Sequence, residues 1–138
     1  MSTDQGVTDD SPMTVIEPPA PSVVVVIGSY AWKSPLAVHE VLGEWWSAHE
    51  KPPVVLVTSG CPAGAEAAAR SFGEANGWQP RIMRDEEMPQ LDGAFFFGFV
   101  KDFSEGAEKV LETLEGRGVW LRVHRDNTDT VKSPWTSR

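Results

Sequence analysis

The hydrophobic positions of this chain fall into short apolar runs separated by longer amphipathic stretches. Four runs are rich in β-branched or aromatic residues, as expected of buried strands, and they cover residues 23–27, 54–58, 93–99 and 119–123. A weaker strand is expected at residues 80–84. Apolar residues recur at helical spacing over residues 35–49, 64–76 and 104–116.

The residues between these segments support the assignment. Ser34 is suited to cap a helix that begins with Pro35, and Asn76-Gly77 is a typical helix stop. Residues 85–92 are too few for a full crossover helix, so we expect a single helical turn or a thin layer there. Strands that alternate with helices predict an α/β fold. We expect a Rossmann-like three-layer sandwich with a mainly parallel sheet of about five strands.

Polar segments flank this pattern on both sides. Residues 1–21 are acidic and proline-rich without periodic apolar positions, and we expect a disordered tail. Residues 126–138 are expected to form a second, polar tail. The predicted domain therefore covers residues 22–125.

The charge of the chain narrows the range of partners. Its 138 residues carry a net charge of −8, with a pI near 4.8. This balance argues against nucleic-acid and anionic-membrane partners, because phosphate backbones select clustered Lys and Arg. No apolar run approaches the roughly 20 residues that span a bilayer, and the acidic N-terminus does not resemble a signal peptide. We therefore expect a cytoplasmic protein.

The residues that most often hold metals are few and scattered. His39, His49 and His124 lack the spacing of a metal site, and the single cysteine, Cys61, excludes an internal disulfide. We expect Cys61 to be a small buried residue, and we expect neither a metal nor a cofactor.

Three loops that follow predicted strands carry the candidate chemistry. The first contains Gly28, Ser29, Tyr30 and Trp32, and the second runs from Ser59 to Glu66 with Gly60 and Gly64. The third, looser loop contains Ser104 and Gly106. Parallel strands end at one edge of a sheet, where loop amides and helix N-termini can bind a phosphate. The three loops therefore predict one ligand pocket.

Each feature also has a purely structural interpretation. Tyr30 and Trp32 could stack on a base or shield the sheet edge. Gly60 and Gly64 could admit a ligand or serve only the backbone geometry. Glu66 could hold a ribose hydroxyl or favour the helix dipole.

The three motifs together resemble the SLOG superfamily of Rossmann-like proteins, and within it the YspA-like, cpYpsA-related group of bacteria and phages. The matching stretches are Gly28-Ser29-Tyr30, Ser59 to Glu66, and Ser104-Glu105-Gly106-Ala107, within about residues 23–125. The resemblance implies that a nucleotide or nucleotide-derived ligand binds at the strand ends. Some members, the cytokinin-activating phosphoribohydrolases, cleave nucleoside monophosphates with a P-G-G-x-G-T-x-x-E motif.

This chain departs from the cleaving members. Ala107 stands where the motif has Thr, Val110 stands where it has the catalytic Glu, and Tyr30 replaces an Arg of the group. We therefore expect binding or sensing of the ligand without catalysis. The alternative enzyme is a nucleotide N-glycosidase whose candidate acids are Glu66, Glu105 and Glu108.

A third alternative is a protein-interaction module with a vestigial pocket. Adjacent Trp45 and Trp46 cannot both point fully inward from one helix, which suggests a homo-oligomer through this helix. The small size and the family's distribution suggest a phage origin, and hence a host cytoplasm.

Overall fold

A central sheet organises the chain, whose computed structural model describes residues 20–101, 105–126 and 136–137. The strands are β1 (Ser22–Gly28), β2 (Val54–Thr58), β3 (Gln79–Ile82), β4 (Phe95–Lys101), β5 (Leu121–Asp126) and β6 (Thr136–Ser137). Their order in the sheet is β3-β2-β1-β4-β5-β6. β1 to β5 are parallel, and β6 pairs antiparallel with β5. The α/β, Rossmann-like fold is confirmed.

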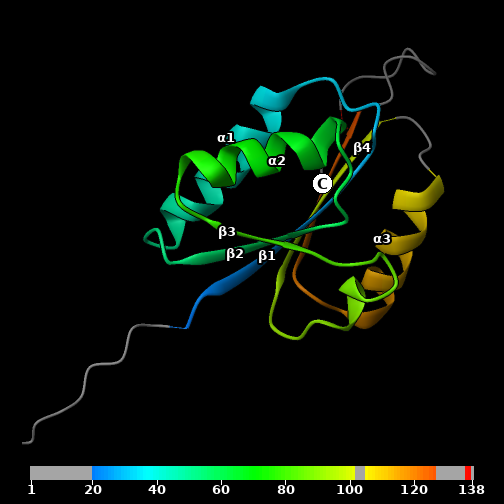
Figure 1. The fold of residues 1–138 in the computed structure, drawn as a ribbon. Coiled ribbons are helices and arrows are strands. Elements are labelled where there is room, and N and C mark those ends of the chain that lie inside the picture. The colour runs from blue at the N-terminus through cyan, green and yellow to red at the C-terminus, as the bar shows by residue number, and fades with distance from the viewer. Residues whose placement is uncertain (1–19, 102–104, 127–135, 138) are drawn as a thin grey trace, which may run out of the picture.

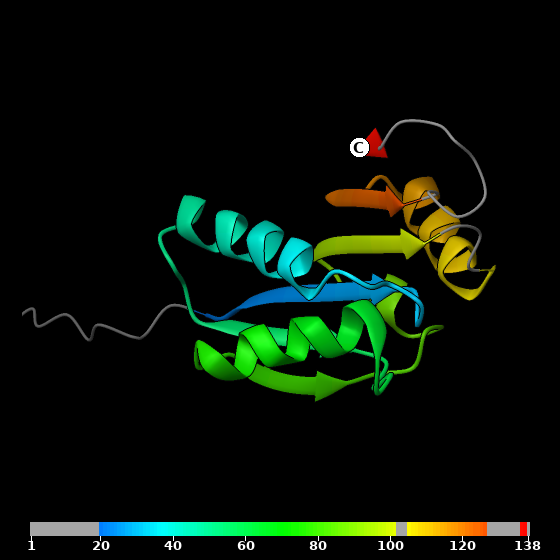
Figure 2. The same cartoon turned by 90° about the horizontal axis from the view of Figure 1, so that it is seen from above.

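Helices cover both faces of the sheet (Figures 1 and 2). The helical elements are α1 (Pro35–Ala48), α2 (Gly64–Ala75), the 3-10 turn η1 (Met88–Gln90) and α3 (Glu105–Arg117). α1 and α2 lie on one face, and η1 and α3 lie on the other. Within the described part of the chain, no helix is long and apolar enough to cross a membrane.

The alternation of side chains along the strands divides the core into two layers. On β1, Val24 and Val26 pack toward α1 and α2, whereas Val25 and Ile27 pack toward η1 and α3. All four side chains are buried. A strand with helices on both faces needs a continuous apolar run, which explains the Val-rich sequence of β1.

Aromatic side chains fill the layer under α1 and α2. Trp45 is buried and packs against Trp78 and Phe95. Trp46 is half-buried, packs edge-on against Trp78 at 5.6 Å between ring centroids, and donates from Nε1 to the carbonyl of Pro52 at 2.8 Å. Both tryptophans are thus accommodated within one chain, so Trp46 gives no support for the expected homo-oligomer.

The predicted helix signals are present with the expected geometry. Ser34 Oγ accepts a hydrogen bond from the N–H of Ala37 at 3.2 Å, and Pro35 opens α1. The chain leaves α2 through Asn76 and Gly77, whose φ is 77°. Between β3 and β4 the expected short turn is η1, which leaves that layer thinner than the opposite one.

Several strand bounds differ from those expected. β3 begins one residue early and ends two residues early, and β4 begins and ends two residues later than the expected strand at 93–99. β5 begins and ends later than the expected strand at 119–123. β6 lies within residues 126–138, which were expected to form only a polar tail. The two residues of β6, a Thr and a Ser, form no apolar pattern from which a strand could be predicted. Backbone pairing with His124 and Arg125 places them in the sheet.

Candidate functional site

The order of the strands places a topological switch point between β1 and β4. The chain leaves the carboxyl end of β1 toward α1 on one face of the sheet, and it leaves β4 toward α3 on the other. Open parallel sheets bind ligands at this point, because the two crossovers diverge and leave a crevice. The loops after β1 and β2 and the start of α3 lie along this edge of the sheet (Figure 2).

The first loop is tied to the neighbouring elements. Ser29 is buried; its N–H donates to the carbonyl of Phe99 at 2.8 Å, and its Oγ accepts from the N–H of Lys101 at 2.8 Å. A Cβ on Gly28 would lie 2.3 Å from Cβ of Ala65. Gly28 and Ser29 therefore hold β1, β4 and α2 together at the switch point.

The two aromatic residues of this loop have different environments. Trp32 is buried, packs edge-on against Phe99 at 5.5 Å, and donates from Nε1 to the carbonyl of Ser34 at 2.9 Å. Tyr30 is 68% exposed. Trp32 is thus part of the core, and Tyr30 is the ring of this loop that a ligand can reach.

The second loop encloses a carboxylate of the protein itself. Glu66 is buried in the first turn of α2. Its Oε1 accepts from the N–H of Ser59 at 2.9 Å, from Ser59 Oγ at 2.7 Å and from the N–H of Cys61 at 3.3 Å. Oε2 lies 2.9 Å from Ser59 Oγ. The N–H groups of Ser59 and Cys61 are thus occupied by Glu66.

The glycines of the second loop have different roles. Gly64 has a φ of 75°, and a Cβ there would lie 2.2 Å from the carbonyl oxygen of Ser29. The adjacent N–H of Ala65 donates to that same oxygen at 3.3 Å. Gly60 is exposed with a φ of 89°, and a Cβ there would lie 3.4 Å from Cγ2 of Ile82. Gly64 therefore allows close packing of the two loops, whereas Gly60 lies at the surface beside β3.

Arg70 is a site residue that the loop motifs did not indicate. It lies one turn after Glu66 on α2, and its Nη2 donates to the carbonyl of Cys61 at 2.5 Å. Its Nη1 lies 3.4 Å from Thr58 Oγ1. Arg70 could have been predicted from its spacing of four residues after Glu66, because residues at this spacing share one face of a helix. Cys61 itself is half-buried rather than fully buried as expected.

The candidate acids of α3 are placed differently from one another. Glu108 forms a two-pronged ion pair with Arg125 on β5, in which Nη2 lies 3.0 Å from Oε1. The Glu108 carboxylate raises the pKa of Arg125 above its ordinary value through these hydrogen bonds. Glu105 and Gly106 are exposed at the start of α3. Ser104 lies outside the described residues.

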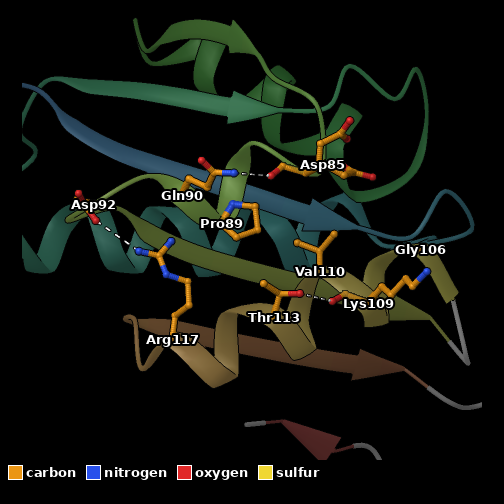
Figure 3. A pocket seen from close by; sticks show the side chains of 10 residues that line it. Asp85, Pro89, Gln90, Asp92, Gly106, Lys109, Val110, Thr113 and Arg117 are labelled. Atoms are coloured by element: carbon orange, nitrogen blue, oxygen red, sulfur yellow. Dashed lines mark hydrogen bonds and ion pairs between the residues drawn. The ribbon is translucent and has the colours of Figure 1, made fainter.

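A groove of about 810 Å³ lies between η1 and α3 (Figure 3). Pro89 and Val110 are its buried residues. The segment around η1 provides acidic and amide side chains, and α3 provides a line of polar ones. Its remaining lining residues are Asp85, Glu86, Gln90, Asp92, Gly106, Lys109, Thr113 and Arg117.

The described residues contain no group of three or more His, Cys, Asp or Glu side chains that could hold a metal ion. His39 contacts the carbonyl of Ala68 at 3.0 Å, and His49 contacts that of Trp45 at 2.8 Å. His124 stacks on Phe99, and burial lowers its pKa below the ordinary value of 6.5, with a smaller contribution from Arg122. The histidines serve packing and helix contacts.

No family model, curated protein or solved structure matches this chain. The resemblance to the SLOG superfamily therefore rests on the three loop motifs alone.

Proposed function

We propose that this protein binds a nucleotide or nucleotide-derived ligand at the carboxyl edge of its sheet, without cleaving it. The observation that carries the proposal is the strand order, which puts the switch point between β1 and β4 beside the loops after β1 and β2 and the start of α3. The exposed Tyr30 ring at the end of β1 gives this edge a surface on which a base can stack.

The arrangement of the acids favours binding over catalysis. A general acid or base must reach the proton that it transfers. Glu66 is buried against Ser59 and Cys61, and Glu108 is paired with Arg125. Of the candidate acids, Glu105 alone is exposed.

Glu66 keeps an indirect role in the proposed binding. Its carboxylate is buried and receives the hydrogen bonds of Ser59 and Cys61, so it acts on a ligand through its charge rather than by direct contact. A neutral ribose hydroxyl is favoured over a phosphate beside this charge, because two anions repel each other at short range. The second loop is therefore proposed to face the sugar.

The first test is a thermal-shift screen of the whole chain against nucleoside monophosphates, NAD, ADP-ribose and cyclic nucleotides. A ligand at 100 times its Kd stabilises a protein by about 2.7 kcal/mol, which raises Tm by several degrees. Each mixture is then assayed for free base. A shift without base release supports a binder, a shift with base release supports the N-glycosidase, and no shift contradicts both.

A matched pair of variants at Tyr30 tests where the ligand lies. Tyr30→Ala removes an exposed ring and should weaken binding about tenfold, since stacking of a base on an aromatic ring contributes about 1–3 kcal/mol. Tyr30→Phe keeps the ring and should keep the affinity. Equal affinity of the Ala variant and the unmodified protein would place the ligand elsewhere.

A further inference from the structure

The face of α3 that lines the groove is polar where a packed helix would be apolar. Gly106, Lys109, Thr113 and Arg117 lie three or four residues apart and therefore share one side of the helix (Figure 3). In a doubly wound fold this side would contact a second crossover helix. Here η1 and its flanks lie opposite, so the polar stripe borders an open groove.

Some charged side chains of the groove form ion pairs, and others form none among the described residues. Arg117 is paired with Asp92 at 3.4 Å, and Glu86 lies 3.8 Å from Arg84. Lys109 and Asp85 are exposed, and no carboxylate of the described residues lies within ion-pair distance of the Lys109 ammonium. Asp92 and Glu86 are thus each paired with an arginine, and the charges left for a ligand are the Lys109 ammonium on α3 and the Asp85 carboxylate on the opposite wall.

The dimensions of the groove suit an extended small molecule. Gly106 and Arg117 are eleven residues apart, so the stripe runs about 16 Å along α3 at 1.5 Å per residue. The volume of about 810 Å³ lies within the range of ligand pockets. α3 begins at the carboxyl edge of the sheet (Figure 2), and Gly106 is its second residue. A Cβ added to Gly106 would meet no atom of the described residues within 4 Å, apart from its chain neighbours and the backbone of α3 itself.

We propose that this groove holds the anionic part of the ligand, with Lys109 as its cation and Asp85 as an acceptor for ligand hydroxyl or amino groups. The inference rests on the proposed function, in which the ligand begins at the switch point. The amides of Ser59 and Cys61 donate to Glu66, so a phosphate bound beside them would meet a carboxylate. The ligand class is a nucleotide with at least one free phosphate that extends from the carboxyl edge along α3.

The test follows the backbone amides of the isotope-labelled full chain by NMR during titration with AMP, ADP and ADP-ribose, with adenosine as the phosphate-free control. The inference predicts shifts at Gly106 and Thr113 with the phosphorylated probes, together with shifts at Tyr30 and Gly60. Lys109→Gln should weaken binding of the phosphorylated probes about tenfold and leave adenosine unchanged. Lys51→Gln, at an exposed lysine outside the groove, is the matched control.

The outcomes separate the two proposals. Shifts at Tyr30 and Gly60 without shifts in the groove, and an unchanged affinity of Lys109→Gln, would overturn the inference and leave the proposed function standing. Shifts in the groove alone would support the groove and contradict a ligand site at the switch point. No shift in either set with any of the three phosphorylated probes would overturn both.

Discussion

Replacing Glu66 should destabilise the fold more than replacing any exposed acid of the same helix. The Glu66→Ala change removes one carboxylate that receives hydrogen bonds from the backbone of Ser59 and Cys61 and from the Ser59 hydroxyl. Glu66 itself is only 5% exposed. The loop after β2 thus loses the group on which these three donors converge.

The size of the effect follows from the number of donors. A hydrogen bond to a charged group contributes about 1.5–3 kcal/mol, and such contributions are not additive within one network. Ser59 and Cys61 are half-buried, so water can replace part of what is lost. We expect Glu66→Ala to lower the free energy of unfolding by about 2–4 kcal/mol and Tm by roughly 10 °C.

Two further variants make the measurement specific. Glu66→Gln keeps an oxygen for the two backbone donors, and its amide can donate to Ser59 Oγ, so it should cost about 1 kcal/mol. Glu74→Ala removes an exposed acid from the same helix and should change stability by less than about 0.5 kcal/mol.

The assay is urea unfolding of each variant, followed by circular dichroism and by tryptophan fluorescence. Coincident transitions with an unchanged m value would show that the variants differ in stability alone. If Glu66→Ala unfolds within about 0.5 kcal/mol of the unmodified chain, the carboxylate does not organise this loop. The amides of Ser59 and Cys61 would then be open to a phosphate after all.

Three other predictions test the packing and the charges. Gly64→Ala should lower the free energy of unfolding, measured in urea, by at least about 3 kcal/mol. Gly77 has a similar φ of 77°, but an added Cβ there would have no atom of the described residues within 4 Å, so Gly77→Ala should lower it by only about 1 kcal/mol. Equal losses would refute the close packing of the two loops. Because burial lowers the pKa of His124, the unfolded chain takes up its proton first, so stability should fall from about pH 7 to about pH 5. His124→Gln should flatten that dependence, and an unchanged slope would contradict the assignment. A double-mutant cycle of Glu108→Gln and Arg125→Met should give a coupling of about 1 kcal/mol that decreases with salt; a coupling near zero would show that the pair does not contribute.

The layers of the fold could be predicted because each strand and helix carries its own pattern. Continuous apolar runs marked β1, β2 and β4, and a cap followed by proline marked α1. The shortage of residues between β3 and β4 predicted the thin layer at η1. β6 could not be predicted, because its two polar residues are placed only by backbone pairing with β5.

The site was harder to predict than the fold, because a glycine indicates a close approach but not the group that approaches. Gly28 and Gly64 were candidate ligand contacts, yet the atoms nearest to them belong to Ala65 and to the backbone of Ser29. Likewise, an acid in the first turn of α2 indicates a partner with hydrogen-bond donors, and Ser59 provides them.

The hydrogen bonds from Ser59 and Cys61 to Glu66 affect which ligand the second loop can accept. A loop whose amides already hold a carboxylate favours neutral hydroxyl groups and disfavours phosphate, because the local charge is negative before any ligand arrives. A nucleotide that binds at this edge should therefore turn its sugar toward Glu66 and its phosphate away from it. The place that remains for the phosphate is the face of the sheet covered by η1 and α3, where Lys109 borders the groove along α3. The position of a single buried acid would thus set the direction in which the ligand lies across the sheet.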